Sequence, residues 1–165
     1  MSELTPSQTV GPFLHLALAD PALATPVAAD DPDALTLTGA VFDGAGAPVP
    51  DAVVETWQWG GPFARCATDA DGRWRILTVK PGPVPGPGGA PQAPHVDLSV
   101  FARGLLNRVV TRLYFGDEPE ANAADPVLSG LGEGQRATLV AEPGDDGYRF
   151  DVHLQGARET TFFTL

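Results

Sequence analysis

The alternation of apolar and polar residues predicts a chain built from short β-strands from residue 35 onward. In residues 35–41 every second position is apolar or small, which is the period of a half-buried strand. Turn signals such as Asp43-Gly44 and Asp71-Gly72 separate this segment from the next ones. Further strands are predicted over residues 52–59, 73–79, 94–102, 108–115, 136–141, 147–154 and 159–164. Only residues 118–122 resemble a helix, so the pattern predicts an all-β, antiparallel β-sandwich with at most one short helix.

The first 34 residues follow no such period. Prolines and glycine interrupt any long helix at Pro6, Gly11, Pro12, Pro21, Pro26 and Pro32. We therefore expect an irregular N-terminal arm over residues 1–34, followed by one sandwich domain over residues 35–165. Residues 81–94 are dense in proline and glycine, and since proline removes ladder donors they are expected to form a loop at a sheet edge.

Charge and cysteine content narrow the possible partners. The chain has 10 Lys and Arg against 21 Asp and Glu, a formal net charge of −11, and no basic run. Nucleic acid and anionic membranes are therefore unexpected partners, because both need a basic patch. A single cysteine, Cys66, excludes an internal disulfide and fits a reducing compartment. With no visible signal peptide or long apolar run, we expect a soluble, cytoplasmic protein.

Candidate metal ligands are few. His95 with Asp97, and Asp151 with His153, each place an imidazole and a carboxylate two residues apart, on one face of a strand. Such a pair can ligate a metal, although a hydrogen-bonded structural histidine or a solvated surface pair is the commoner state. Tyr114 and Tyr148 lie in alternating strands, where an aromatic side chain normally packs. From chemistry alone, the chain is a β-rich domain without a complete catalytic site.

A series of short motifs resembles the intradiol ring-cleaving dioxygenases. The motifs follow in family order over nearly the whole length: residues 5–13, Lys80-Pro81-Gly82-Pro83-Val84, Ala93-Pro94-His95-Val96-Asp97, Phe101-Ala102-Arg103-Gly104 and Thr111-Arg112-Leu113-Tyr114-Phe115. The family's iron-binding core has a Tyr after Pro-Gly-Pro and a His-x-His motif further on. Here Val84 and Asp97 stand at the Tyr and second His positions, Gln92 stands at an Arg position, and the short link over residues 60–63 lacks the other Tyr ligand. The resemblance is therefore to the alpha subunits of the two-chain, protocatechuate-cleaving members.

This resemblance carries several implications. It implies that a homologous beta subunit binds Fe(III), and that alpha and beta chains form an (αβ)n assembly that is active only as a complex. The implied reaction is cleavage of protocatechuate by O2 to 3-carboxy-cis,cis-muconate, in aromatic catabolism by the β-ketoadipate pathway. This chain would supply no catalytic residue and no metal ligand. By motif position it would bind substrate through Thr9, Gly11, Pro12, Phe13 and Arg103.

Physical chemistry gives these residues plausible tasks. The planar, permanently charged guanidinium of Arg103 suits a substrate carboxylate. Gly11 lets backbone approach a ligand closely, and Phe13 would wall the aromatic ring. The family often has Tyr at the position of Phe13, so a phenol hydrogen bond is absent here. An ordinary turn and a surface ion pair would explain the same residues without any ligand.

Two other functions compete with this interpretation. Residues 35–82 also match a non-enzymatic, transthyretin-like β-sandwich binding module, although that leaves the arm and residues 101–115 unexplained. The other is a self-sufficient intradiol dioxygenase with unusual ligands, namely His95, Asp97 and Asp151.

Overall fold

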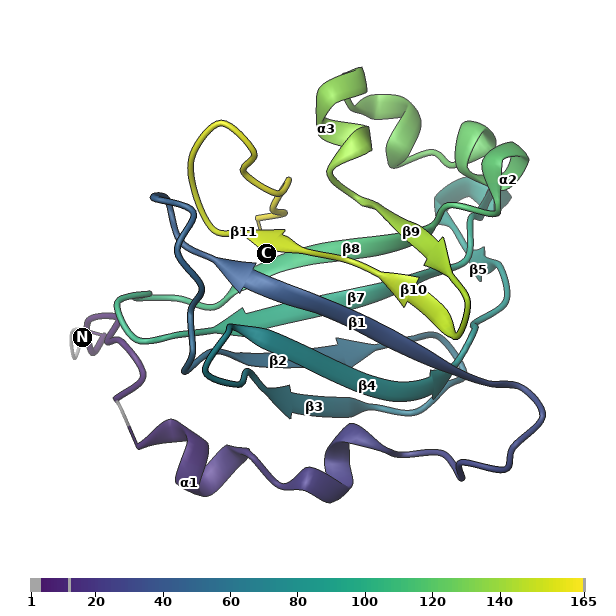
Figure 1. Cartoon of the computed structure of the whole chain (residues 1–165). Helices are drawn as coiled ribbons and strands as arrows, with labels where there is room; N and C mark the ends of the chain where they lie inside the picture. The colour runs from purple at the N-terminus through teal and green to yellow at the C-terminus, as the bar shows by residue number, and fades with distance from the viewer. Residues whose placement is uncertain (1–3, 12, 165) are drawn as a thin grey trace.

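Two layers of strands face each other in the computed structural model, which describes residues 4–11 and 13–164 (Figure 1). One layer runs in the order β3 (Ala64–Ala67), β2 (Val53–Trp57), β7 (His95–Phe101), β8 (Val109–Phe115). The other contains β4 (Arg73–Val79), β1 (Ala34–Phe42), β10 (Gly147–Arg149) and β11 (Val152–His153). Strand β9 (Val140–Gly144) pairs with β8 and with β10, and so joins the layers. Strands β5 (Val84–Pro85) and β6 (Pro91–Gln92) form a separate hairpin.

The alternation in β7 decides which side chains face outward. Val96, Leu98 and Val100 are fully buried in the core between the layers. Successive strand residues point to opposite faces, so His95 and Asp97 lie on the outer face of this layer. Strand β8 pairs with β7 in antiparallel register, and Asp97 lies opposite Arg112. The register therefore gathers polar side chains on one outer face of the sandwich.

The predicted fold class is confirmed, with two corrections. First, the described residues contain three short α-helices rather than at most one: α1 (Leu14–Leu18), α2 (Pro119–Ala124) and α3 (Glu133–Ala137). Helix α3 begins where the Gln135 side chain accepts a hydrogen bond of 3.1 Å from the Gly132 N–H, a local cap that strand periodicity does not reveal. Second, the largely antiparallel pairing includes three parallel pairs, β1 with β10, β1 with β11 and β8 with β9.

Three predicted strands differ from the structure. Residues 136–141 begin inside α3, and β9 starts only at Val140. Residues 147–154 break between β10 and β11, because the Asp151 carboxylate accepts the Ala40 N–H at 2.9 Å, in place of a ladder carbonyl. Residues 159–164 form no strand.

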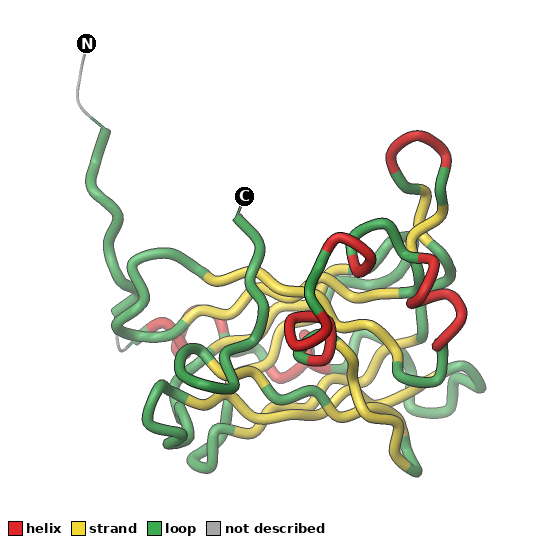
Figure 2. Tube along the Cα trace, turned by 90° about the horizontal axis from the view of Figure 1, so that it is seen from above, coloured by secondary structure: helices red, strands yellow, loops and turns green. Residues whose placement is uncertain are grey.

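The N-terminal segment lies outside the two layers. Helix α1 and the 3-10 turn η1 (Pro21–Ala24) follow the edge of the sandwich beside β3 (Figure 1). Residues 4–11 extend outward from the two layers of strands (Figure 2). In the part of the chain that the structure describes, no helix is long and apolar enough to cross a membrane.

Candidate functional site

The loop that follows β7 brings Arg103 close to the N-terminal segment. Gly104 has a φ of +89°, a conformation that glycine adopts readily, and this turns the chain directly after Arg103. The Gly104 N–H donates to the Thr9 hydroxyl at 2.8 Å, which joins two residues 95 positions apart in sequence. Arg103 forms an ion pair with Asp51, and 62% of its side chain stays exposed. The structure therefore brings Thr9 and Arg103 to the same loop and leaves the guanidinium accessible.

The other predicted substrate residues are spread along the start of α1. The Gly11 carbonyl accepts a hydrogen bond from the Leu14 N–H at 3.1 Å, and no atom lies within 4 Å of the place where a Cβ on Gly11 would be. Phe13 is 71% exposed. Pro12 lies outside the described residues. Gly11, Phe13 and Arg103 are not among the residues that line the depression nearest to them.

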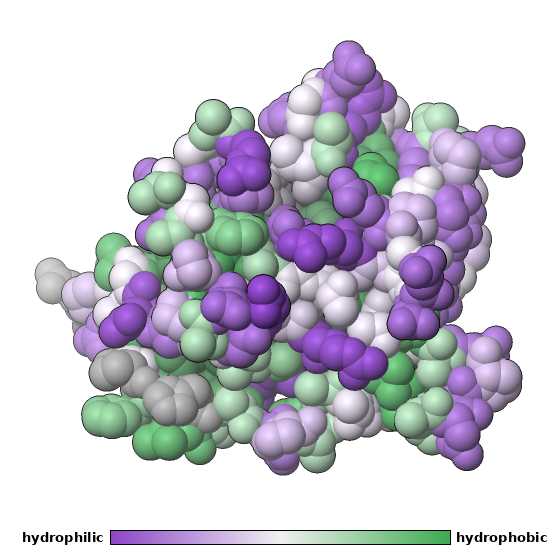
Figure 3. All heavy atoms as spheres, in the orientation of Figure 1, coloured by the Kyte–Doolittle hydropathy of each residue, from purple (hydrophilic) through white to green (hydrophobic). Residues whose placement is uncertain are grey.

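A shallow depression lies beside them. It has a volume of about 240 Å³, and Gln8 and Val10 face the 101–108 segment across it. Leu106 on its rim is 62% exposed, and Leu16 of α1 is 74% exposed. Figure 3 shows apolar atoms gathered over the α1 end of the molecule. This end of the chain combines an accessible cation with exposed apolar side chains.

Near the start of β7 the structure places what we call the Arg112 cluster: Gln92, His95, Asp97, Arg112 and Tyr114. Arg112 donates to the Asp97 carboxylate at 3.0 Å, to the Gln92 side-chain oxygen at 2.6 Å and to the Tyr114 hydroxyl at 3.3 Å. The His95 Nε2 lies 4.0 Å from the Asp97 carboxylate, and its Nδ1 lies 2.8 Å from the Ala93 carbonyl oxygen.

Burial sets the protonation of the two rings in this cluster. Burial lowers the pKa of His95, and the nearby Arg112 charge acts in the same direction, against the Ala93 carbonyl. Burial raises the pKa of Tyr114 to about 12, although Arg112 opposes that rise. At neutral pH the cluster therefore holds a neutral imidazole, a neutral phenol and an Asp97–Arg112 ion pair.

The buried carboxylate of Asp125 connects this cluster to the segment that follows α2. Asp125 is fully buried and accepts hydrogen bonds of 2.8 to 2.9 Å from the backbone N–H groups of Ala93, Val127 and Leu128. The Tyr114 hydroxyl lies 3.4 Å from the same carboxylate. Asp125 thus joins the chain before β7 to the turn after α2.

The residues at the motif positions do not fit a ferric ion. Val84 in β5 offers only an aliphatic side chain, and the Asp97 carboxylate is bound to the Arg112 guanidinium. No group of three or more His, Cys, Asp or Glu side chains within residues 4–11 and 13–164 is arranged to hold a metal ion. Asp151 contacts Ala40 of β1, in the other layer, and so does not join His95 and Asp97. The set of three unusual ligands is therefore not assembled.

Lys80, directly before the Pro-Gly-Pro motif, is a second cation whose charge is paired within the chain. Lys80 Nζ lies 2.9 Å from Asp117 and 2.7 Å from Glu118, and 5.0 Å from the centre of the Phe115 ring. Burial alone would lower the pKa of Lys80, but the two carboxylates outweigh it and raise that pKa. Tyr148 donates to Asp117 at 2.8 Å and completes the cluster. These contacts fix the chain between β4 and β5.

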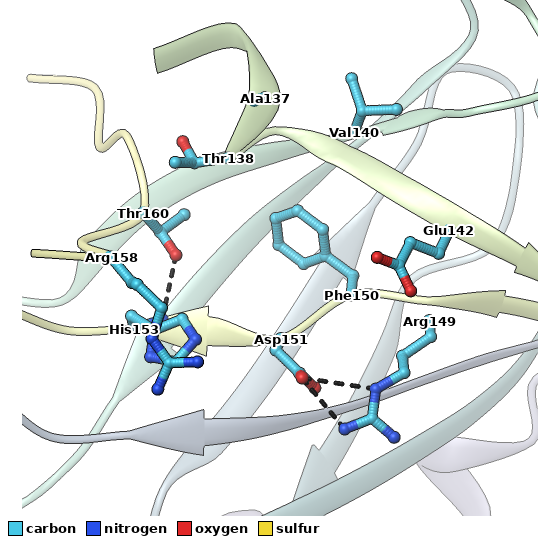
Figure 4. A pocket seen from close by; sticks show the side chains of 10 residues that line it. All are labelled: Ala137, Thr138, Val140, Glu142, Arg149, Phe150, Asp151, His153, Arg158 and Thr160. Carbon is cyan, nitrogen blue, oxygen red and sulfur yellow. Dashed lines mark hydrogen bonds and ion pairs between the residues drawn. The ribbon is translucent and has the colours of Figure 1, made fainter. Parts of the chain in front are cut away.

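Another depression, of about 320 Å³, lies between α3 and the β10–β11 segment (Figure 4). Its charged groups include Arg149, paired with Asp151 at 3.0 Å, and Arg158 beside His153. Partial burial and then the Arg158 charge lower the pKa of His153. None of the residues predicted to bind substrate lines it.

Sequence reasoning did not foresee the roles of Arg112, Asp125 and Lys80. A cross-strand register would have found one of them, because Asp97 and Arg112 are direct partners on β7 and β8. For Lys80 no local signal exists, since Asp117 and Glu118 are distant in sequence. For Asp125 the hydrogen bonds from Val127 and Leu128 are local and typical of an Asp at a turn, but the bond from Ala93 is not visible in the sequence.

Comparisons with known proteins give a consistent result. The chain is 41% identical to the protocatechuate 3,4-dioxygenase alpha chain of Pseudomonas putida, covering 96% of this chain and 95% of that one. It is 33% identical to the protocatechuate 3,4-dioxygenase beta chain of Burkholderia cepacia, over 76% and 66% of the two chains. The dioxygenase domain of a dioxygenase carbohydrate-binding protein fusion from Streptomyces sp. SirexAA-E is similar in structure, with a TM-score of 0.63, 26% identity, and 81% and 88% of the chains covered. No family model matches.

Proposed function

This chain belongs to the family of protocatechuate 3,4-dioxygenase alpha chains, and from that membership we propose that it is the subunit without iron in a two-chain intradiol dioxygenase. The complex cleaves protocatechuate with O2 to 3-carboxy-cis,cis-muconate, as part of aromatic catabolism by the β-ketoadipate pathway. The observation that carries this proposal is the near full-length similarity to alpha chains, in a chain whose ligand positions hold Val84 and Asp97. The family membership also argues against a transthyretin-like binding module.

In this proposal the partner is a homologous beta subunit, in an (αβ)n assembly without nucleic acid or membrane. The similarity of the chain to a beta chain supports a partner of the same fold. Exposed apolar side chains near the arm, including Phe13 and Leu16, support a contact surface there. The beta subunit holds the Fe(III), which supplies the activation of the catechol toward O2. A cytoplasmic location accords with the lone, unpaired Cys66.

The contribution of this chain is to bind and orient the substrate at the mouth of the partner's site. Arg103 lies on a loop fixed to the arm through Thr9, and its exposed guanidinium is available to the substrate carboxylate. Residues 1–34 are the arm that reaches the partner's site, where Gly11, Pro12 and Phe13 approach the aromatic ring. Binding one end of the substrate from the alpha chain places the diol toward the beta chain.

The test is affinity purification of the tagged chain from its native host, with mass spectrometry and iron analysis of the eluate. We expect a stoichiometric partner of related sequence that carries Pro-Gly-Pro-Tyr and His-x-His, and about one iron per pair. A chain that elutes alone and free of iron would contradict the proposal. A chain that elutes alone with iron would instead indicate a self-sufficient dioxygenase.

A further inference from the structure

We propose that the Arg112 guanidinium occupies the position from which a metal ion would bind the oxygen atoms of its cluster, and that its charge keeps this chain free of metal. The inference concerns side chains of this chain alone and does not depend on the proposed partner. It accounts for a chain that has the fold of an iron-binding family and yet is proposed to hold no metal ion of its own.

Three oxygen atoms surround the guanidinium, at 2.6 Å for Gln92, 3.0 Å for Asp97 and 3.3 Å for Tyr114. They come from a carboxylate, an amide and a phenol. The His95 Nε2 lies 4.0 Å from the Asp97 carboxylate. Carboxylate, carbonyl and imidazole groups are ordinary ligands of divalent cations, so the donors are present and the central position is filled.

A guanidinium stays protonated at every physiological pH, so a metal ion entering the cluster would meet a positive charge within a few ångströms. Asp97 is the carboxylate that pairs with this charge. Without the guanidinium, the Asp97 carboxylate and the Gln92 oxygen would lose their donors. Leaving polar groups unpaired is costly, and an added cation would restore their partners.

The Asp97 side chain is 45% exposed, whereas that of Arg112 is 23% exposed. An ion can therefore reach the carboxylate from solvent without any opening of the sandwich. A metal ion is therefore excluded because the Arg112 guanidinium occupies its position, and not because the cluster is closed to solvent.

The experiment measures Co(II) uptake by the untagged full chain with equilibrium dialysis and visible absorption. It compares the wild type with Arg112→Met, which removes the charge, and Arg112→Lys, which keeps it. Arg149→Met serves as the matched control, because Arg149 lies on β10 and also pairs with an aspartate. Uptake is counted as the difference from wild type prepared in the same way, so any iron held by a co-purifying partner cancels.

We expect about one additional Co(II) per chain for Arg112→Met, with a metal-dependent rise in its melting temperature, and none for Arg112→Lys or Arg149→Met. The inference is overturned if folded Arg112→Met takes up no more Co(II) than wild type, or if Arg112→Lys takes up as much. Should Arg112→Met fail to fold by circular dichroism, Arg112→Gln replaces it, because its amide can still contact Tyr114 or Gln92. The double variant His95→Gln/Arg112→Met should then bind Co(II) at least about tenfold more weakly.

Discussion

The cationic side chains near the two ends of β7 differ in how far they are buried and paired. Arg112 and Lys80, close to the start of the strand, each contact several oxygen atoms of the same chain, and their side chains are 23% and 24% exposed. Arg103, just after the end of the strand, pairs with Asp51 and is 62% exposed. The first two hold parts of one chain together. The Arg103 side chain stays exposed, so the substrate contact proposed above lies at the periphery of this chain and not at the motif that lacks the iron ligands.

The same contrast extends to the neighbouring backbone. Around the Arg112 cluster, Asp125 accepts three backbone hydrogen bonds and is fully buried. Around Arg103, the arm is tied to the loop by the hydrogen bond from Gly104 to the exposed Thr9, the one that joins them within residues 4–11 and 13–164. The Arg112 cluster is fixed by many contacts within its own chain, whereas the Arg103 loop has few. In the proposed complex, contacts from the partner subunit would fix the Arg103 loop.

The largest effect should come from Asp125→Ala. It leaves the N–H groups of Ala93, Val127 and Leu128 without their acceptor in a buried place, so we expect a loss of about 4 kcal/mol in the free energy of unfolding. Urea denaturation measures it. Asp117→Ala, at a half-exposed carboxylate, is the control and should cost about 1 kcal/mol. Equal losses in the two variants would remove the distinction between the saturated cluster and the surface.

Arg103→Ala should act on substrate and hardly on the fold. Loss of a charge that binds the substrate carboxylate should raise the apparent KM for protocatechuate about tenfold in the complex, with iron content unchanged. Steady-state kinetics and iron analysis measure both quantities. Arg103→Lys keeps the charge but not the planar fork, and should fall between wild type and Ala. Unchanged kinetics would show that Arg103 only pairs with Asp51.

The comparison also explains what could be predicted from the sequence. In β4 buried and more exposed residues alternate along the strand, which is the period of two that reveals a strand in a sequence. Strands β1, β7 and β8 are covered on parts of both faces, and they were found from their runs of apolar and β-branched residues between turn signals. The loss of iron ligands was visible at Val84 and Asp97, because motif spacing needs no coordinates. The Arg112 cluster depends on strand register and on Gln92 arriving from the β5–β6 hairpin, and neither is written in a local pattern. Helix α3 and the break before β11 depend on single side-chain hydrogen bonds, which periodicity does not detect.

A pH profile distinguishes the Lys80 contacts from ordinary surface pairing. Partial burial would raise the pKa of Asp117, but hydrogen bonds from Lys80 and Tyr148 outweigh it and lower that pKa below 3.8. The folded pKa is below the unfolded one, so this stabilisation is complete above pH 3.8 and is lost as the pH falls through the folded pKa. Lys80→Met should therefore lower the free energy of unfolding by about 1 kcal/mol at pH 7, and the gap to wild type should narrow at acid pH.

Urea denaturation at several pH values down to the acid transition measures this gap. Lys80→Arg retains the charge and should follow the wild type more closely than Lys80→Met does. A gap that stays constant as the carboxylate is protonated would mean that Lys80 acts through packing against Phe115 and Tyr148, and not through Asp117.

The smallest effect should come from Thr9→Val, which removes the hydroxyl that accepts the Gly104 N–H. An exposed hydrogen bond of this kind contributes roughly 0.5 to 1 kcal/mol, so exchange of the Gly104 amide should become about two- to fivefold faster while the free energy of global unfolding stays unchanged. Hydrogen exchange followed by NMR measures it, and Thr9→Ser, which keeps the hydroxyl, should retain the protection. Because Arg103 precedes Gly104, a faster exchange should be accompanied by a modest rise in the KM for protocatechuate in the complex. An exchange rate that rises without any change in KM would mean that the partner, and not Thr9, fixes the Arg103 loop.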